Sequence, residues 1–321
     1  MKYAGIDVSA HKLDVCDPAK LQVENTASGH QLIIRSLTRG QTARVCLEAT
    51  GNYGLDLALA LDRAEGIEVM VINPRAAHHF AQAMMKRSKT DPVDAQILRE
   101  YARRMDFVPW TPPAGEQLEL RALARRSLAL TDMMTQEKNR LHAAESTAEL
   151  AFIRNDIEVG IRHFERRIAE LEKQMKRIIA DHPQIKRAIG RMTSIKGIAL
   201  TSAVRIYAEL CVLPADMSAR QWVAHAGLDP RHMESGTMAG KTRISKTGNK
   251  HLRCALYMPV LTAVQYDPNI KAFYEKLIGK GKLKIQAHVA VMRKLLHSIH
   301  GMLRHDADFD GQKFYAVPEN A

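Results

Sequence analysis

The chain has 321 residues, and its length and composition limit what kind of protein it is. With 46% hydrophobic residues it can bury sizeable cores, and its length predicts two domains, with or without a connector, rather than one small domain. Its 47 Lys and Arg residues outnumber 35 Asp and Glu, for a net charge of +12. Such an excess favours a polyanionic partner such as nucleic acid, without separating DNA from RNA.

The cysteines and the N-terminus indicate a reducing compartment. The four cysteines lie far apart and form no CxxC pair, which favours neither a zinc site nor a disulfide framework. Asp7 interrupts the first apolar run before a signal-peptide core could form, and no later run approaches the roughly 18 residues of a membrane span. The sequence therefore predicts a soluble, cytoplasmic protein with no membrane partner.

The first hundred residues alternate strand and helix patterns. Strands are expected at 2–8 and 12–16, joined by a tight hairpin, with a third around 21–24. Further strands are expected at 44–48 and 67–72, and helices at 29–37, 55–64, from Pro74 onward and at 91–105. This alternation predicts an α/β domain with a mixed sheet.

The middle of the chain predicts a helical connector. FVPWTPP (107–113) cannot continue a helix and marks the first boundary. Residues 116–180 are rich in helix formers, and apolar residues from Ile157 to Ile178 recur in steps of four and three, as in a coiled coil. A helical hairpin packing on itself and a dimerising coiled coil explain this pattern equally well. After His182-Pro183 a mostly helical unit follows, so the expected parts are 1–108, 109–182 and 183–321.

Four acids have routes to one point of the N-terminal domain. Asp7 stands inside an apolar strand, where an unpaired charge costs several kcal/mol and therefore needs a partner, a metal or a rim position. Glu48 ends another apolar strand, and Asp91 and Asp94 share one face of a helix. Each also has a plain structural interpretation, such as helix-dipole stabilisation for Asp91. Jointly, clustered carboxylates suit Mg²⁺ or Mn²⁺, and two ions about 3.5 to 4 Å apart serve phosphodiester chemistry.

Basic residues precede these acids and fill a Gly-rich stretch near the C-terminus. The segment Lys86, Arg87, Lys89 leads directly to the acidic helix, either as a phosphate-attracting segment or as a solvated basic face. In the stretch 222–253, glycines permit close backbone approach to phosphates. Its candidate nucleic-acid ligands are Arg231, Lys241, Arg243, Lys246, Asn249 and Arg253.

Two smaller features of the C-terminal half also admit two interpretations. Ser235-Gly236 places a hydroxyl in the cation-rich loop, where it could attack phosphorus, although such a serine far more often only forms a turn. Upstream, residues 189–210 predict two helices joined by a turn at Lys196-Gly197. The N-terminal amides of the second helix either hold a phosphate or simply pack.

Four separated motifs carry a resemblance to a known family. They read GIDVSAHKLDV at the start, LEATGNYG from Leu47, KTDPVDAQIL from Lys89, and AGLDP, ESG and SKTGNKHLR near the end. In this order, over essentially the whole chain, they resemble DEDD-type transposases of the insertion sequence one-ten family, including related site-specific DNA invertases. One departure is the turn at Gly197-Ile198-Ala199, which lacks a second glycine.

The resemblance implies a RuvC-like, RNase H-type N-terminal domain and a C-terminal transposase domain, to which the sequence patterns add a helical coiled-coil connector and a mainly helical C-terminal part. It implies that Ser235 is the nucleophile and that Mg²⁺ is held by Asp7, Glu48, Asp91 and Asp94. It also implies a nucleoid-associated bacterial enzyme whose partners are double-stranded DNA of element ends and targets and a structured noncoding guide RNA. A homodimer or homotetramer is expected, in which the acids of one subunit act with the serine of another.

Three other functions stay open on the residues alone. In an RNase H-fold nuclease or Holliday-junction resolvase, metal-activated water would be the nucleophile and Ser235 would only line a turn. A non-catalytic nucleic-acid-binding scaffold would need the positive charge but not the acids. An actin-like ATPase or sugar kinase has a strand and hairpin like GIDVSAHKLDV, but here the glycine after Val8 and a second phosphate loop are missing.

Overall fold

The computed structural model describes residues 1–17, 20–39, 42–49, 53–85, 91–144, 151–231, 234–235, 238–239 and 243–317, with the backbone alone at 91–92, 234–235 and 238–239. They divide into two compact units, Met1–Pro112 and Pro113–Ala321, and each is described by itself. The division lies within the proline-containing segment that the sequence predicts as the first boundary. The finer division into three functional parts stays a prediction.

A five-stranded sheet in the order β3-β2-β1-β4-β5 forms the centre of the N-terminal unit. The strands are β1 (Lys2–Val8), β2 (Lys12–Cys16), β3 (Lys20–Glu24), β4 (Ala43–Glu48) and β5 (Ile67–Ile72). β1 pairs antiparallel with β2 and parallel with β4, and β4 pairs parallel with β5. The predicted α/β unit with a mixed sheet is therefore confirmed.

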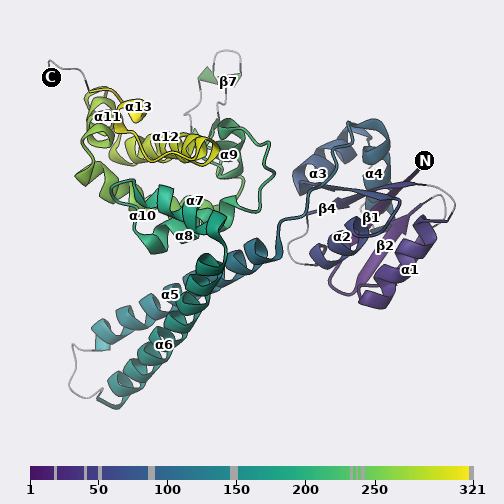
Figure 1. Cartoon of the computed structure of the whole chain (residues 1–321), viewed down its shortest axis with the longest axis horizontal. Helices are drawn as coiled ribbons and strands as arrows, with labels where there is room; N and C mark the ends of the chain where they lie inside the picture. The colour runs from purple at the N-terminus through teal and green to yellow at the C-terminus, as the bar shows by residue number, and fades with distance from the viewer. Residues whose placement is uncertain are drawn as a thin grey trace. The chain divides into compact units, whose positions relative to one another are not determined.

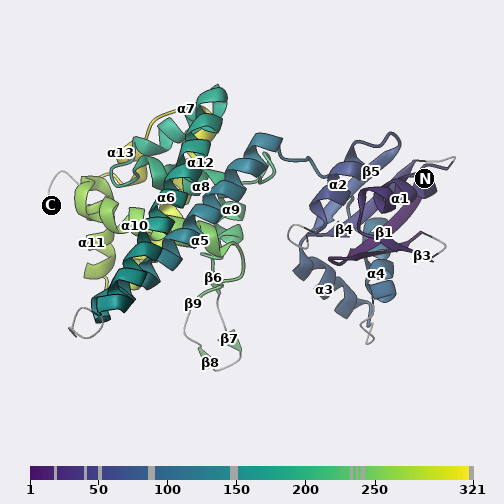
Figure 2. The ribbon, with the colours of Figure 1, turned by 90° about the horizontal axis from the view of Figure 1, so that it is seen from below.

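Helices cover both faces of this sheet (Figure 2). They are α1 (Ala27–Leu37), α2 (Leu55–Asp62), α3 (Pro74–Ala83) and α4 (Asp91–Arg104). α1 and α2 bury the face that carries Ala4, Ile6 and Val45. α3 and α4 bury the opposite face, where Cys46 and Met70 belong to a smaller core. Because side chains alternate along a strand, Gly5 and Asp7 of β1 lie on the α4 side.

α4 crosses the central strand at a glycine. A Cβ atom at Gly5 would lie 2.1 Å from the carbonyl oxygen of Ala95 and 2.3 Å from the backbone nitrogen of Arg99. Arg99 Nε donates a hydrogen bond to the carbonyl oxygen of Tyr3 at 3.1 Å. The helix therefore runs opposite to β1, in contact with its backbone, and only a glycine permits this approach. As a result the N-terminal end of α4 lies toward the carboxyl end of β1.

The C-terminal unit is mainly helical, as predicted. Its helices are α5 (Gly115–Ala144), α6 (Ala151–Asp181), α7 (Pro183–Thr193), α8 (Leu200–Leu210), α9 (Ala219–His225), α10 (Lys250–Tyr266), α11 (Pro268–Gly279), α12 (Lys284–His305) and α13 (Gly311–Phe314). Its short strands are β6 (Pro230–Arg231), β7 (Glu234–Ser235), β8 (Met238–Ala239) and β9 (Arg243–Ile244). In the part of the chain that is described, no helix is both long and apolar enough to cross a membrane.

α5 and α6 lie along each other as an antiparallel pair (Figure 1). Ile157 and Ile161 pack near Leu141 at one end of the pair, while Met175 and Ile178 join the main core at the other. These isoleucines and Met175 belong to the predicted heptad pattern, so contact within the chain explains their burial. A dimerising coiled coil stays a prediction.

The predicted turn between two helices joins α7 to α8. Gly197 in this turn has a φ angle of 101°, and a Cβ there would lie 2.5 Å from the backbone nitrogen of Ala263 in α10. The glycine therefore allows the turn to pack against α10. Phosphate binding by this turn stays a prediction.

Asp267 caps α11 from a buried position. Its Oδ1 accepts hydrogen bonds at 3.0 Å from the amides two and three residues on, and the residue is 6% exposed. Since Asp267→Ala would leave both amides without this acceptor, we expect the free energy of unfolding to fall by about 1 to 2 kcal/mol. Fluorescence-monitored denaturation with Trp110→Phe isolates Trp222, because the chain has two tryptophans. Asp181→Ala, at an exposed position, should cost under about 0.5 kcal/mol; equal losses would contradict the capping role.

Candidate functional site

The first two predicted acids occupy neighbouring positions at the carboxyl end of the central strands. β1 and β4 run parallel with Ile6 opposite Leu47, so Asp7 and Glu48 each follow one residue later. Burial, and after it the negative charge of Glu48, raise the pKa of the Cys46 thiol to about 12. The Glu48 carboxylate therefore lies on the same face of the sheet as Cys46, which is the face that α4 covers and that also carries Asp7.

The other two predicted acids belong to the start of α4. Ala95 of this helix lies on Gly5. Asp91 is about one helical turn before Ala95, and Asp7 is two residues after Gly5 on the same face of β1. Because α4 runs opposite to β1, both steps lead toward the same end of the sheet. Asp94 is half-buried, as are Asp7 and Glu48. Asp91 is described only by its backbone, which begins the helix. The fold therefore brings the four backbone positions to one end of one face of the sheet.

The donor chemistry of these acids suits a divalent metal ion. Among the described side chains, no three from Asp, Glu, His and Cys stand together as a ready metal site. Asp7, Glu48 and Asp94 nevertheless offer oxygen donors alone, from half-buried positions at one end of the sheet. Oxygen donors are the ligands that Mg²⁺ and Mn²⁺ prefer. The donor atoms of these three acids are therefore of the type that such an ion prefers. The side chain of Asp91 lies outside the described residues.

A fifth carboxylate, which sequence reasoning missed, stands next to Asp7. Asp14 is opposite Asp7 in the antiparallel register of β1 and β2 and is 7% exposed. Its Oδ1 accepts a hydrogen bond from Gln22 Nε2 at 2.9 Å. Opposed residues in such a pair have Cβ atoms about 4.5 to 5.5 Å apart, and like charges there destabilise each other. The available signal was the sequence KLDVC, in which an acid interrupts an apolar strand as in GIDV.

Ser235 belongs to a hairpin that grows from a short paired base. β6 and β9 form the base, with Arg231 opposite Arg243, and further along the hairpin Ser235 in β7 pairs with Met238 in β8. Figure 2 shows β7 and β8 beyond β6 and β9, away from the helices. The backbone pairing therefore places the serine outside the helical core of its unit, in a hairpin flanked by arginines.

The segments before and after this hairpin bind each other. Ser245 donates hydrogen bonds to Asp229, from its backbone nitrogen to the carbonyl oxygen at 2.9 Å and from Oγ to Oδ1 at 2.5 Å. A Cβ atom at Gly248 would lie 2.2 Å from the carbonyl oxygen of His225, and the φ angle of Gly248 is 143°. The Gly248 of the SKTGNKHLR motif is therefore required for backbone packing at the hairpin base.

The predicted nucleic-acid ligands differ in their surroundings. Asn249 caps α10 through its side chain, and Arg253 Nη1 donates to the carbonyl oxygen of Ala226 at 2.8 Å. Arg231, Arg243 and Lys246 are exposed at the hairpin base. Lys86, Arg87, Lys89 and Lys241 lie outside the described residues. Contact of any of them with nucleic acid stays a prediction.

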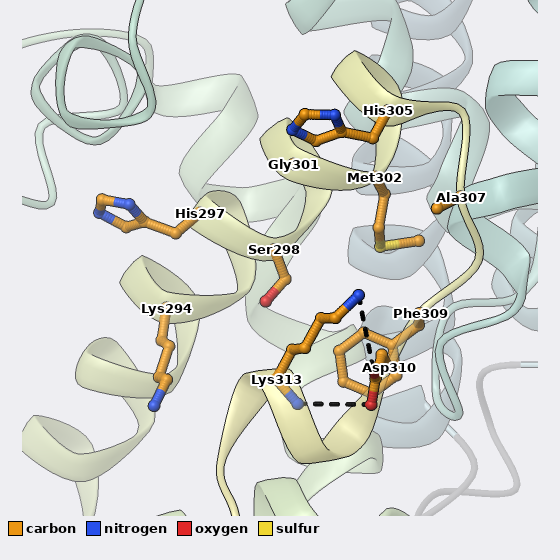
Figure 3. A pocket seen from close by; sticks show the side chains of 10 residues that line it. All are labelled: Lys294, His297, Ser298, Gly301, Met302, His305, Ala307, Phe309, Asp310 and Lys313. Carbon is orange, nitrogen blue, oxygen red and sulfur yellow. Dashed lines mark hydrogen bonds and ion pairs between the residues drawn. The ribbon is translucent and has the colours of Figure 1, made fainter.

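A pocket of about 350 Å³ in the C-terminal unit contains none of the predicted site residues (Figure 3). Lys313, which Figure 3 shows directed at Asp310, has its Nζ 3.7 Å from Oδ2 of that carboxylate. Lys294 Nζ lies 4.5 Å from the ring centre of Phe273. Both lysines of the pocket therefore have partners within the chain, and the pocket adds no group to the candidate site.

Two family models match this chain, one in each part. Residues 4–144 match a DEDD model of the IS110 type, described as a transposase, and residues 190–275 match the model described as the transposase IS116/IS110/IS902 family. The chain belongs to the IS110 family of transposases. The resemblance to the insertion sequence one-ten family is thereby confirmed. The matched ranges include the four acids in the first and Ser235 in the second.

Several proteins are similar to this IS110-family chain over much of its length. A pilin gene-inverting protein of Moraxella bovis is 28% identical over 320 residues, which cover 96% of this chain and 97% of the relative. An uncharacterised 42 kDa protein of insertion element IS900 from Mycobacterium paratuberculosis is 24% identical, covering 79% and 81%. The transposase for insertion sequence element IS1328 of Yersinia enterocolitica is 27% identical, covering 59% and 61%.

Family membership determines the coarse activity. The chain is a transposase, an enzyme that acts on DNA by cutting and rejoining strands. DEDD transposases typically use a divalent metal ion, in agreement with the oxygen donors of the N-terminal unit. The five-stranded mixed sheet of that unit is compatible with a RuvC-like DEDD domain.

Proposed function

We propose that this IS110-family transposase is a site-specific recombinase that excises and inserts element DNA through a serine-linked intermediate. The observation that carries the proposal is the register of β1 and β4, which sets Asp7 beside Glu48 while α4 starts toward the same end of the sheet. Binding of a cation would explain why four acids gather at one end of a sheet, whereas a purely structural role would not. The serine hairpin supplies the second half of the chemistry.

The four acids hold Mg²⁺, for which Mn²⁺ can substitute. When bound, the ion polarises the scissile phosphate and stabilises negative charge on the leaving oxygen. The carboxylates orient the ion. Because Gly5 lets α4 pack closely on β1, the two acids of the helix keep a fixed backbone position relative to the acid of the strand. The set is Asp7, Glu48, Asp91 and Asp94.

Ser235 is the nucleophile. Its Oγ attacks the phosphorus of one strand, an Oγ–P bond forms, the bond from phosphorus to one sugar oxygen breaks, and the serine proton passes in net terms to the departing sugar hydroxyl. Arg231 and Arg243 at the hairpin base neutralise charge on the phosphate oxygens. A second strand end then displaces Ser235 by the reverse exchange. One phosphoester bond is exchanged for another at each step, so rejoining needs no ATP.

The substrates are the element ends and a target site in double-stranded DNA. The name of the Moraxella bovis relative describes gene inversion and that of the Yersinia relative describes transposition, and both outcomes require strands to be cut and rejoined. A structured RNA from the element's noncoding end guides the choice of site, which the net charge of +12 favours. The active assembly is a dimer or tetramer in which the acids of one subunit act with the serine of another.

Covalent attachment to DNA tests the mechanism. Purified protein is incubated with element-end DNA, target DNA, RNA transcribed from the flanking noncoding region and Mg²⁺, and denaturation-resistant protein–DNA adducts are measured. We expect an adduct in the wild type that falls on the order of a thousandfold or more in Ser235→Ala. Ser298→Ala on α12 serves as the matched control and should retain the adduct.

Each other outcome favours a different function. Metal-dependent cuts without an adduct, unchanged in Ser235→Ala, would support an RNase H-fold nuclease that activates water. Binding of DNA or RNA without any metal-dependent cleavage would support a non-catalytic scaffold. A reaction that proceeds equally without the RNA would contradict guidance by RNA but not the serine chemistry.

A further inference from the structure

A buried ionic network of the C-terminal unit includes a residue of the segment that follows the serine hairpin. Glu209 of α8 is 3% exposed, although it is charged. Arg125 of α5 donates to both of its oxygens, from Nε to Oε1 and from Nη2 to Oε2, each at 2.7 Å. Asn249 Nδ2 donates to Oε2 at 2.6 Å. A buried carboxylate persists only with such compensation, and removal of one partner leaves an uncompensated charge.

The network is ionised. Burial by itself raises the pKa of Glu209, but the hydrogen bonds from Arg125 and Asn249, together with the charges of Arg125 and His251, outweigh burial and leave this pKa below its usual value. The hydrogen bond to Glu209 likewise raises the pKa of Arg125. Hydrogen bonds to ionised groups are shorter and roughly twice as strong as neutral ones. The geometry around Glu209 is therefore held more firmly than packing alone would hold it.

Asn249 joins this network to the hairpin. Its Oδ1 accepts hydrogen bonds from the backbone nitrogens of His251 and Leu252, which begin α10, so its amide nitrogen is directed to Glu209. The backbone nitrogen of Asn249 donates to the carbonyl oxygen of His225 at 2.7 Å, and its Nδ2 lies 3.4 Å from His225 Nε2. His225 ends α9 before the hairpin and Asn249 follows β9 after it, so Asn249 links the segments that enter and leave the hairpin to Glu209 in the core.

We propose that Glu209 is a positioning residue for Ser235, acting by holding Asn249 in the one orientation that serves both the hairpin base and the cap of α10. This inference rests on the serine-linked mechanism proposed above. The hairpin needs an anchor because its strand pairs are only two residues long, far below the length that is stable in isolation. Arg231 and Arg243 lie opposite each other and repel, which increases that need.

The polarity of the hydrogen bonds gives a sharp test. In Glu209→Gln the remaining oxygen can still accept from Arg125 Nε, but an NH₂ group at the Oε2 position meets the NH₂ group of Asn249 and also Arg125 Nη2, donors facing donors. In Asn249→Asp two carboxylates meet at the 2.6 Å contact. The double change Glu209→Gln with Asn249→Asp reverses the donor and acceptor, keeps the network's total charge, and leaves an oxygen to cap α10.

Three measurements on the whole 321-residue chain compare the wild type, the two single variants and the double variant. Single-turnover formation of the Ser235–DNA adduct should slow on the order of 100-fold in each single variant, because a displacement near 1 Å has that effect, and should recover to within about tenfold in the double variant. DNA affinity should stay within about threefold in Glu209→Gln, which changes no predicted nucleic-acid ligand. Amide hydrogen exchange in residues 243–249 should become at least tenfold faster in the single variants and be restored in the double.

Glu165→Gln is the matched control. Glu165 also pairs with a cation of α5, Lys138 Nζ at 3.4 Å, but both side chains are about half exposed at 51% and 52%. This variant should leave adduct formation and the exchange of 243–249 unchanged, since exposed ion pairs contribute little.

The outcomes separate this inference from the mechanism on which it rests. Wild-type rates of adduct formation in folded Glu209→Gln, or single variants that the double change does not rescue, would overturn the positioning role. A wild-type protein without a Ser235-dependent adduct would instead overturn the proposed mechanism. The exchange measurement would then still decide whether Glu209 holds the hairpin base, because unchanged exchange in Glu209→Gln contradicts it.

Discussion

Asp7→Asn is expected to lose DNA strand cleavage by about a thousandfold while the protein stays folded and binds DNA. The amide has nearly the size of the carboxylate but lacks its charge, so the acid set binds the metal ion less well, at a cost of several kcal/mol in transition-state stabilisation. Asp14 stands opposite in the register, so the loss of one of two like charges should not lower stability. Cleavage of element-end DNA across a Mg²⁺ titration measures the effect.

Asp106→Asn is the matched control for this loss, because it removes a carboxylate of the same unit from an exposed position after α4. It should cleave at the wild-type rate. Chelation of divalent ions should abolish cleavage by the wild type, and Mn²⁺ should restore it. Cleavage by Asp7→Asn at the wild-type rate and Mg²⁺ requirement would remove the acid set from the mechanism.

Gly5→Ala is expected to destabilise the N-terminal unit by about 3 kcal/mol or more, the upper end of the range for overpacked cores. The added methyl would lie 2.1 Å from the carbonyl oxygen of Ala95, 2.3 Å from Arg99 N and 2.9 Å from the carbonyl carbon of Leu98. All three are backbone atoms, so no side-chain rotation relieves the overlap and α4 must move. Denaturation followed by Trp110 fluorescence with Trp222→Phe measures the unit that contains it.

Gly190→Ala is the control, since no atom lies within 4 Å of its added methyl and the residue is inside α7. This change should stabilise the C-terminal unit by about 0.5 to 1 kcal/mol, read from Trp222 with Trp110→Phe, because alanine favours the helix. If Gly5→Ala unfolds at the wild-type denaturant concentration, the close approach of α4 to β1 is wrong. A variant that remains folded is still expected to cleave poorly, because displacement of α4 moves Asp91 and Asp94.

Local patterns in the sequence were sufficient for most elements of the fold. Alternation of apolar residues predicts β1 and β2, and the order of strand and helix patterns predicts the mixed sheet. The helix of 91–105 and the turn at Gly197 follow from Pro and Gly, which constrain the backbone locally. The motifs were also sufficient for the family, because the spacing of acids and glycines along the chain does not depend on tertiary contacts.

Only the tertiary structure decided which residues meet. Register, which no single strand contains, sets Asp14 opposite Asp7 and Asp7 beside Glu48. In a heptad pattern the apolar positions show that a face is buried but not by what, and here α5 covers the α6 face within the chain.

The buried pair of Glu209 and Arg125 shows the same limit most clearly, since a charged residue in a helix is ordinarily solvated and its sequence neighbours do not reveal a partner 84 positions away. The sequence by itself determined most of the elements and the family, and it named the four candidate acids, because these follow from local backbone preference and residue type. Register, helix approach and long-range ion pairs came from the tertiary structure alone, because each depends on atoms that folding brings together.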